Sequence, residues 1–277
     1  SLRASFSIEA ALQDLDEKLA IADFVYHLAG VNRPQSDDEF RSGNVDLTTY
    51  ICGRLQEGLR PVPLVFASSI QALFENPYGI SKLQAEGVVA RYAEECGVRV
   101  VIYRLKNVFG KWCRPHYNSA VATFCHCIAH EQSINISDPD RELELVYVDD
   151  VVEHFIANIF AVESNGVIFR EVSPHFRITL GELAELIRSF RQMRQTLIVP
   201  DLSNEFIGKL YGTYLSYLEP NDFAYGLDVK CDQRGCLSEF AKSSSFVQIF
   251  VSRTKPGITR GNHYHHSLPP GQMKEPH

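Results

Sequence analysis

The sequence predicts an α/β protein with a doubly wound parallel sheet, followed by a smaller segment of β structure. Short apolar runs alternate with helical periodicity over the first two thirds of the chain, which is typical of parallel strands joined by helices. After about residue 211 the helical periodicity fades, while Gly and aromatic residues become more frequent. We therefore expect a boundary between about residues 200 and 225, with domains at 1–215 and 216–277.

The elements follow one another in the order that such a sheet requires. Apolar runs predict strands, and the amphipathic stretches between them predict helices that cover both faces of the sheet. From the N-terminus we expect a helix opening at or before Ser7, a strand at 24–30, a helix near 46–59, a strand at 64–67, a helix extending to about 95, a strand at 98–105 and a helix near 119–130.

Two later segments carry signals of their own. The stretch Thr179–Glu182 has the spacing of a capping box, in which the Thr and Glu side chains bind backbone amides at the start of a helix. The stretch Ser245–Ser252 alternates apolar and polar residues and predicts a half-buried strand.

Composition excludes several classes of function. The net charge is −7, the pI is near 5.8 and no basic run is present, so we expect no nucleic-acid or membrane-surface partner. No apolar stretch approaches the roughly 20 residues that span a bilayer, and the N-terminus does not resemble a signal peptide. The 7 Cys include no C-x-x-C pair, which predicts reduced thiols and a cytoplasmic protein.

Tyr78 and Lys82 are the strongest candidates for catalysis. Residues four apart share one face of a helix, and a Lys ammonium beside a phenol favours the phenolate. Such a Tyr can exchange a proton with a substrate oxygen near neutral pH. Ser69 or Ser68, at the end of the preceding apolar run, could hydrogen-bond the same oxygen. The alternative is a helix whose Tyr and Lys merely share a surface, because Y-x-x-x-K is frequent by chance.

Loops at the carboxyl ends of the predicted strands supply further candidates, since doubly wound sheets bind ligands there. Small residues in H-L-A-G (27–30) would let a cofactor approach the backbone, and Arg33 could pair with a phosphate. A third loop spans Arg104 to Gly110. Ordinary turn chemistry explains each loop alone, whereas their convergence beside a Tyr/Lys pair favours a ligand site.

Together these motifs resemble the extended short-chain dehydrogenase/reductases of the nucleotide-sugar epimerase/dehydratase family. The resemblance covers about residues 5 to 210. Within that family, H-L-A-G-V-N-R-P and the tail S-R-T-K-P-G-I-T-R-G-N-H-Y-H-H are similar to the CapF-type capsular polysaccharide synthesis enzymes, which join a Rossmann-like reductase domain to a C-terminal cupin. The motifs that carry the resemblance are H-L-A-G, N-V-D-L-T (44–48), S-S followed by Y-G-I-S-K, R-L-K-N-V-F-G and Y-V-D-D-V (147–151).

The resemblance implies NADPH-dependent reduction of a UDP-linked 4-keto-6-deoxy-N-acetylhexosamine, on the route to UDP-N-acetyl-L-fucosamine and capsular polysaccharide. It also implies a cytoplasmic homodimer. Two alternatives stay open: a UDP-sugar 4-epimerase or dehydratase, and a catalytically incomplete fragment that only binds nucleotide sugar. The choice between NADPH and NADH is open as well.

Residue by residue, the resemblance makes Tyr78 the general acid that protonates the C4 oxygen. Lys82 would hold the nicotinamide ribose and keep the Tyr acidic, and Ser69 fits the motif's Ser better than Ser68. Asp149 and Asp150 match a partly structural signature at a helix N-terminus. The resemblance further implies that His27, Ala29 and Gly30 line the cofactor, and that Arg33, Asn107 and Lys111 contact the substrate.

His263 and His265 are candidate metal ligands, because two His at i and i+2 on a strand face the same side. Their spacing from Gly257 resembles the first half of a cupin metal motif, in which zinc is a candidate for the complete cupin. Pro269 and Pro270 stand where a third ligand is needed, and a second motif is absent. We therefore expect a partial cupin-like domain without a competent metal site.

The glycine fingerprint G-x-G-x-x-G is also missing from the sequence. We therefore expect a Rossmann-like sheet that lacks its first βαβ unit, in a chain truncated at both ends.

Overall fold

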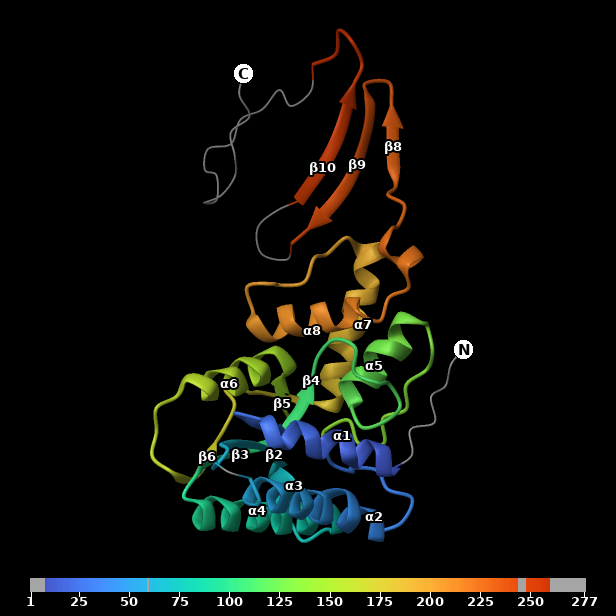
Figure 1. Cartoon of the computed structure of the whole chain (residues 1–277). Helices are drawn as coiled ribbons and strands as arrows, with labels where there is room; N and C mark the ends of the chain where they lie inside the picture. Colours follow the sequence, from blue (N-terminus) through green and yellow to red (C-terminus); the bar gives the residue numbers. More distant parts are fainter. Residues whose placement is uncertain (1–7, 59, 244–247, 260–277) are drawn as a thin grey trace. The chain divides into compact units, whose positions relative to one another are not determined.

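The computed structural model of the protein describes residues 8–58, 60–243 and 248–259 (Figure 1). The chain forms two compact units. Unit 1 comprises Ser1–Ala120 and Glu142–Ile178, and unit 2 comprises Val121–Arg141 and Thr179–His277. The chain therefore passes between the units more than once, and a domain boundary near residue 215 stays a prediction.

Unit 1 is built on a four-stranded sheet with the strand order β1-β2-β3-β6. All three of its pairings are parallel. Helices connect the strands, as parallel pairing requires. The strands are β1 (Val25–His27), β2 (Leu64–Ser69), β3 (Arg99–Leu105) and β6 (Gly166–Arg170), and the helices are α1 (Ile8–Ile21), α2 (Asp38–Phe40), α3 (Leu47–Gln56), α4 (Pro77–Cys96) and α6 (Val148–Phe160).

Alternate residues of β2 and β3 enter two separate cores, because successive side chains of a strand point to opposite faces. One core joins the sheet to α1, α3 and α4, and the other contains Val151 and Phe155 of α6. The predicted doubly wound sheet with helices on both faces is confirmed. The first core takes Leu64, Phe66, Val100 and Ile102 from the sheet, and the second takes Val65, Val101 and Tyr103.

Element boundaries differ from the sequence expectation around β1. The predicted strand 24–30 contains only three strand residues, and Leu28, Ala29 and Gly30 form an exposed loop. The helix expected near residue 46 is preceded by a π-helical turn, η1 (Arg41–Asp46). A second sheet in unit 1, with the order β4-β5-β7, was not predicted; its strands are β4 (Asn107–Phe109), β5 (Glu142–Tyr147) and β7 (Phe176–Thr179).

Unit 2 contains three helices and an antiparallel sheet among its described residues. Thr179 and Glu182 form the predicted capping box at the start of α7. The helices are α5 (Ala120–Ala129), α7 (Leu180–Thr196) and α8 (Glu205–Leu215), and a 3₁₀ turn, η3, spans Pro220–Phe223. The sheet has the order β10-β9-β8, with β8 at Val229–Asp232, β9 at Gly235–Lys242 and β10 at Gln248–Thr254.

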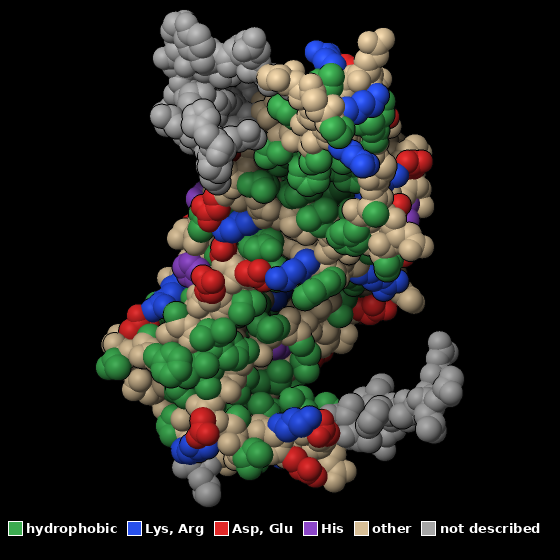
Figure 2. Space-filling model, turned by 90° about the horizontal axis from the view of Figure 1, so that it is seen from above, with side chains coloured by type: hydrophobic (Ala, Val, Ile, Leu, Met, Phe, Trp, Pro, Cys, Tyr) green, Lys and Arg blue, Asp and Glu red, His purple; other side chains and the backbone are tan. Residues whose placement is uncertain are grey.

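Residues 248–252 of the strand predicted over 245–252 lie in β10, and for these residues the expectation of a half-buried strand is wrong; residues 245–247 lie outside the described residues. All of its residues are exposed, and Ile249, Phe250 and Val251 are 51, 56 and 67% exposed. Alternation predicts a strand, whereas burial requires a second layer, which the described residues do not supply to β10. Figure 2 shows apolar side chains at the surface among charged ones.

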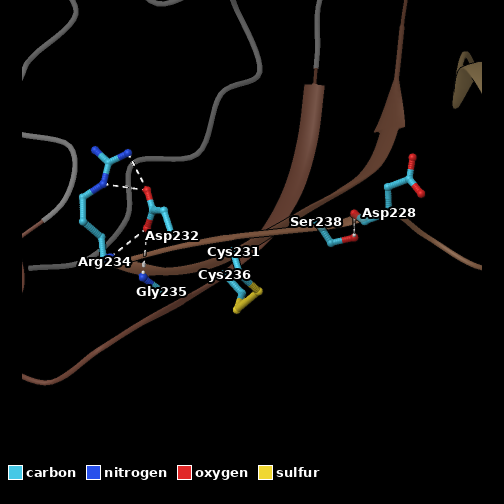
Figure 3. The surroundings of a disulfide bond; sticks show 7 residues. All are labelled: Asp228, Cys231, Asp232, Arg234, Gly235, Cys236 and Ser238. Atoms are coloured by element: carbon cyan, nitrogen blue, oxygen red, sulfur yellow. Dashed lines mark hydrogen bonds and ion pairs between the residues drawn. A yellow bond between two sulfur atoms is a disulfide. The ribbon is translucent and has the colours of Figure 1, made fainter.

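Cys231 and Cys236 form a disulfide at the β8–β9 turn (Figure 3). The expectation of reduced thiols is therefore wrong for these two residues, because the hairpin places them opposite one another with their Cα atoms 4.1 Å apart. The remaining cysteines, Cys52, Cys96, Cys113, Cys125 and Cys127, form no disulfide among the described residues. None of the described helices is both long enough and apolar enough to cross a membrane.

Candidate active site

The site begins where β2 ends and α4 starts. After Ser69 the chain makes a 3₁₀ turn, η2 (Ile70–Leu73), and the Ser69 Oγ accepts a hydrogen bond from the Gln71 amide at 3.2 Å. Asn76 caps α4 by accepting from the Gly79 amide at 2.8 Å, and Pro77 occupies the first helical turn, where a missing N–H costs nothing. This local sequence fixes the helix start, and with it the position of Tyr78.

Gly79 allows α4 to begin directly against η2. A Cβ at this position would lie 2.2 Å from the Gln71 carbonyl oxygen and 2.5 Å from that of Phe74. Both are backbone atoms, so no side chain could move aside to make room. The glycine beside Tyr78 is therefore required by the close approach of the two segments.

Tyr78 is half-buried, and its ring centroid lies 5.7 Å from that of Phe40 in α2. Burial raises the pKa of Tyr78 from its ordinary value, and a hydrogen bond with Ser69 opposes that rise. The net direction differs from our expectation that Lys82 makes this Tyr more acidic, because burial is the larger effect. A phenol with a raised pKa remains protonated and can donate its proton.

Lys82 is buried one helical turn further along α4. Its Nζ donates to the Ala67 carbonyl oxygen at 2.8 Å and lies 4.6 Å from the centroid of the Phe66 ring. Burial lowers the pKa of Lys82 to about 8, and Glu86 opposes that change. The amine therefore changes its charge close to physiological pH.

The two serines at the end of β2 have different surroundings. Ser68 is buried, and its Oγ donates to Glu86 Oε1 at 2.6 Å. Ser69 is partly exposed, and it is the serine whose side chain opposes the rise in the Tyr78 pKa. The geometry thus favours Ser69 over Ser68 as the partner of the tyrosine.

The loop after β1 approaches the same helix. Ala29 and Gly30 are exposed, and a Cβ at Gly30 would lie 2.7 Å from Asn44 Oδ1 and 3.6 Å from Lys82 Nζ. Asn44 fixes this loop, since its Oδ1 accepts from the Val31 amide at 2.8 Å and its Nδ2 donates to the Val31 carbonyl oxygen at 2.9 Å. The loop therefore passes directly above the lysine.

The His27 side chain is buried in the fold. Its Nε2 lies 2.8 Å from Thr48 Oγ1, and Thr48 donates its own hydroxyl proton to the Asn44 carbonyl oxygen at 2.6 Å. The imidazole Nε2 must then carry the proton of the first bond. Burial and the nearby Lys82 charge lower the pKa of His27 to about 4. The side chain is neutral and buried, so only the backbone of His27 could contact a cofactor.

The predicted substrate residues Arg33, Asn107 and Lys111 also belong to unit 1. Asn107 Nδ2 donates to the Glu144 carbonyl oxygen at 3.1 Å, which ties it to β5. Lys111 pairs with Asp149 at 3.0 Å, and this hydrogen bond raises the pKa of Lys111. Asp149 and Asp150 occupy the first turn of α6, as the sequence predicted. Arg33 is exposed and makes no ion pair with other described residues.

The structure thus brings together Ser69, Tyr78, Lys82 and Gly30, while Asn107 lies in β4 and Lys111 lies in the turn that follows it. In the sequence, Asn44, Thr48 and Ser81 lie in motifs and Arg104 lies in a candidate loop, but none of them was assigned a supporting role. Glu86, four residues after Lys82, was not singled out at all. In the structure these residues support the first group: Asn44, Thr48, Ser81 and Glu86 are buried, and Arg104 is half-buried.

Polar side chains at the carboxyl ends of parallel strands, beside a Ser/Tyr/Lys group, define a dinucleotide-dependent α/β enzyme. Residues 6–168 match the NAD dependent epimerase/dehydratase family, and residues 230–269 match the Polysaccharide biosynthesis C-terminal domain. The chain belongs to the NAD dependent epimerase/dehydratase family, and so to enzymes that use a nicotinamide cofactor.

Individual relatives are similar over most of this chain. It is 43% identical over 262 residues to the UDP-2-acetamido-2,6-beta-L-arabino-hexul-4-ose reductase of Pseudomonas aeruginosa, covering 95% of this chain and 70% of that protein. The crystal structure of the capsular polysaccharide assembling protein CapF from Staphylococcus aureus matches with a TM-score of 0.82 and 44% identity, again over 95% and 70%. A Bacillus cereus UDP-glucuronic acid 4-epimerase, 18% identical with a TM-score of 0.58 over 64% of this chain and 62% of its own, shares the fold.

The predicted metal ligands His263 and His265 lie outside the described residues. Within the part of the chain that the structure describes, no three His, Cys, Asp or Glu side chains gather as a metal site would require. The antiparallel strands β8, β9 and β10 follow the parallel sheet along the chain, as expected for a β segment after the Rossmann-like part.

Proposed function

We propose that this chain reduces the 4-keto group of a UDP-linked 4-keto-6-deoxy-N-acetylhexosamine with NADPH, in the cytoplasmic synthesis of UDP-N-acetyl-L-fucosamine for capsular polysaccharide. The observation that carries the proposal is the Ser69–Tyr78–Lys82 group at the end of β2, in a chain 43% identical to a UDP-sugar 4-keto reductase. The deoxy amino sugar and the preference for NADPH follow from that likeness.

Tyr78 is the proton donor in this proposal. Its raised pKa keeps the phenol protonated. Ser69 lies next to it at the end of β2, so a keto oxygen placed there can accept one hydrogen bond from the Tyr78 hydroxyl and one from the Ser69 hydroxyl. As the C4 carbon gains hydride, negative charge develops on the oxygen and Tyr78 transfers its proton there. Burial and these hydrogen bonds orient the donor before the reaction.

The residues around Gly30 fit a nicotinamide cofactor. A side chain at Gly30 would fill the space beside Lys82 Nζ, so glycine keeps a cradle open at the carboxyl end of β1. Lys82 would bind the ribose hydroxyls, and the backbone of Ala29 and Gly30 would line the cradle. The cofactor, when bound, supplies the hydride.

The test is to follow NADPH absorbance on adding the UDP-4-keto sugar, with NADH in a parallel reaction. We expect NADPH oxidation, with NADH markedly poorer, and a 4-hydroxy product. Interconversion of UDP-hexoses without net oxidation of NADPH would support the epimerase alternative instead. Binding of UDP-sugar with no turnover of either kind would support a chain that only binds nucleotide sugar.

We also propose a homodimer and a domain boundary near residue 215. Ile80 and Leu83 on the outer face of α4 are 47 and 51% exposed, and a second copy could cover them. Sedimentation analysis would show the dimer mass, and a Leu83→Glu variant should sediment as a monomer.

Limited proteolysis should cut first between residues 216 and 228 if the proposed boundary is correct.

A further inference from the structure

Glu86 is a buried carboxylate at the base of the candidate active site. It is 4% exposed, and a buried charge is costly unless it is paired and hydrogen-bonded. Ser68 Oγ donates to its Oε1 at 2.6 Å. Arg104 binds it in a two-pronged manner, with Nε 3.0 Å from Oε1 and Nη2 2.7 Å from Oε2.

These partners come from the two strands that carry the site. Ser68 and Arg104 are directly paired in the register of β2 and β3, so the Glu86 carboxylate bridges both strands at one level. Ser68 immediately precedes Ser69, while Lys82 and Tyr78 lie one and two helical turns away from Glu86 on the same face of α4. The network therefore joins α4 to both strand ends directly below the reacting groups.

Arg104 is itself held in place, with its guanidinium carbon 4.7 Å from the centroid of the Phe169 ring. The ionisable groups around Lys82 are Glu86 and Tyr78 on α4 and His27 on β1, and of these Glu86 favours the charged amine. His27 is neutral at physiological pH. Of these groups, Glu86 is therefore the one whose negative charge stabilises the ammonium form of the buried Lys82.

We propose that Glu86 is a positioning residue: held by Ser68 and Arg104, its carboxylate fixes α4 against the ends of β2 and β3, and keeps the Lys82 ammonium charged. Tyr78 and Ser69 are thereby held in the geometry that proton donation needs. The catalytic part of this inference rests on the proposed function, whereas the link between Glu86 and Lys82 does not.

The ordinary alternative is an ion pair that only stabilises the fold. Unit 1 offers a matched control in Glu163, which pairs with Arg170 and with the buried Arg99. Glu86→Gln and Glu163→Gln each remove one carboxylate charge from an arginine pair while keeping the side-chain shape. A purely structural role predicts that the two variants differ only in stability.

The experiment measures the charge of Lys82 directly, by NMR titration of lysine labelled with ¹³C at Cε, with Lys82→Arg identifying the signal. We expect Glu86→Gln to lower the Lys82 pKa by about one unit or more, and Glu163→Gln to leave it unchanged.

In Glu86→Gln, kcat for NADPH oxidation should fall roughly tenfold to a hundredfold with little change in KM, and this loss should grow as pH rises. Glu86→Asp should restore most of the Lys82 pKa but not kcat, because the shorter side chain keeps the charge and loses the position.

An unchanged Lys82 pKa in Glu86→Gln would overturn the proposal, as would a kcat equal to that of Glu163→Gln. If Glu86→Gln does not fold, Glu86→Gln with Arg104→Met removes the unpaired cation and should fold, still with a lowered Lys82 pKa; a normal value there would also overturn it. If the unmodified chain oxidises no NADPH, the reductase proposal fails, while the titration still decides whether Glu86 charges Lys82.

Discussion

The paired strands β2 and β3 differ sharply from β9 and β10, although apolar residues occur in all four. Leu64, Val65, Val100 and Val101 are fully buried, whereas every residue of β10 is exposed. The β2–β3 register is unbroken, while the β9–β10 register shifts between Ile249 and Phe250. Burial by helices on both faces is what makes one pair of strands precise enough to hold reacting groups.

The two regions are also stabilised by different means. The β2–β3 pair relies on side chains buried against α3, α4 and α6, each contributing about 1.5–3 kcal/mol. The β8–β9 hairpin relies on its turn, where Asp232 accepts hydrogen bonds from the Arg234 and Gly235 amides next to the disulfide (Figure 3). The first arrangement depends on distant parts of the chain, and the second is local.

If the buried strand ends carry the chemistry, Tyr78→Phe should produce the largest effect. Removing the proton donor should lower kcat for keto-sugar reduction by about 10²–10⁴-fold, with the affinity for nucleotide sugar nearly unchanged by calorimetry. Tyr225→Phe, in the polar-rich stretch before β8, is the control and should retain full activity. Lost binding in Tyr78→Phe would instead indicate that this tyrosine is structural.

Matched truncations test the packing difference itself. Ile102→Ala in β3 should lower the free energy of unfolding by about 2–5 kcal/mol, because it leaves a cavity between packed layers. Ile249→Ala in β10 should change it by no more than about 0.5 kcal/mol. Denaturant titration measures both, and equal losses would show that β10 is covered in solution.

His27 should give unit 1 a characteristic response to acid. Its pKa of about 4 in the folded protein lies below the ordinary 6.5. Between these two pH values His27 is therefore protonated in the unfolded chain and neutral in the folded protein. Stability from this source is complete above pH 6.5 and falls as pH drops toward 4, by about 3 kcal/mol in all. His27→Gln should flatten this part of the stability curve, and an unaltered slope would contradict the buried neutral imidazole.

The smallest effect is expected at the hairpin disulfide. Replacing Cys231 and Cys236 with Ser should weaken the β8–β9 hairpin by about 2 kcal/mol, since the bond closes only a short loop. Amide hydrogen exchange should therefore accelerate in β8 and β9 and remain unchanged in β2 and β3. Faster exchange in β2 or β3 would show that the two regions are coupled.

Many helices and strands of the chain could be predicted because their signals are local. The capping residues around α7, the Y-x-x-x-K spacing in α4 and the small residues after β1 depend on neighbours a few positions away. The sheet β4-β5-β7 was missed, because its short strands pair segments far apart in sequence. The alternation in β10 predicted a strand correctly but could not reveal whether another layer covers it.

The candidate site shows the same division. Tyr78 and Lys82 were found from spacing, while the direction of the Tyr78 pKa was mistaken, since desolvation depends on how the whole fold encloses the phenol. The roles of Asn44 and Glu86 were not predicted, because each binds partners from other elements. The sequence motif favoured Ser69 over Ser68, and the structure shows that the two side chains have different surroundings, with Ser68 buried against Glu86.

The sequence by itself determined most of the order of strands and helices, the family and the candidate reacting side chains, because helical and strand periodicities and motif spacings are properties of neighbouring residues. Only the tertiary structure decided that Ser68 binds a buried carboxylate, that His27 is an internal neutral group, and that Glu86 bridges two strands beneath Lys82. Burial and long-range pairing set charge and orientation, and both arise only when distant segments pack together.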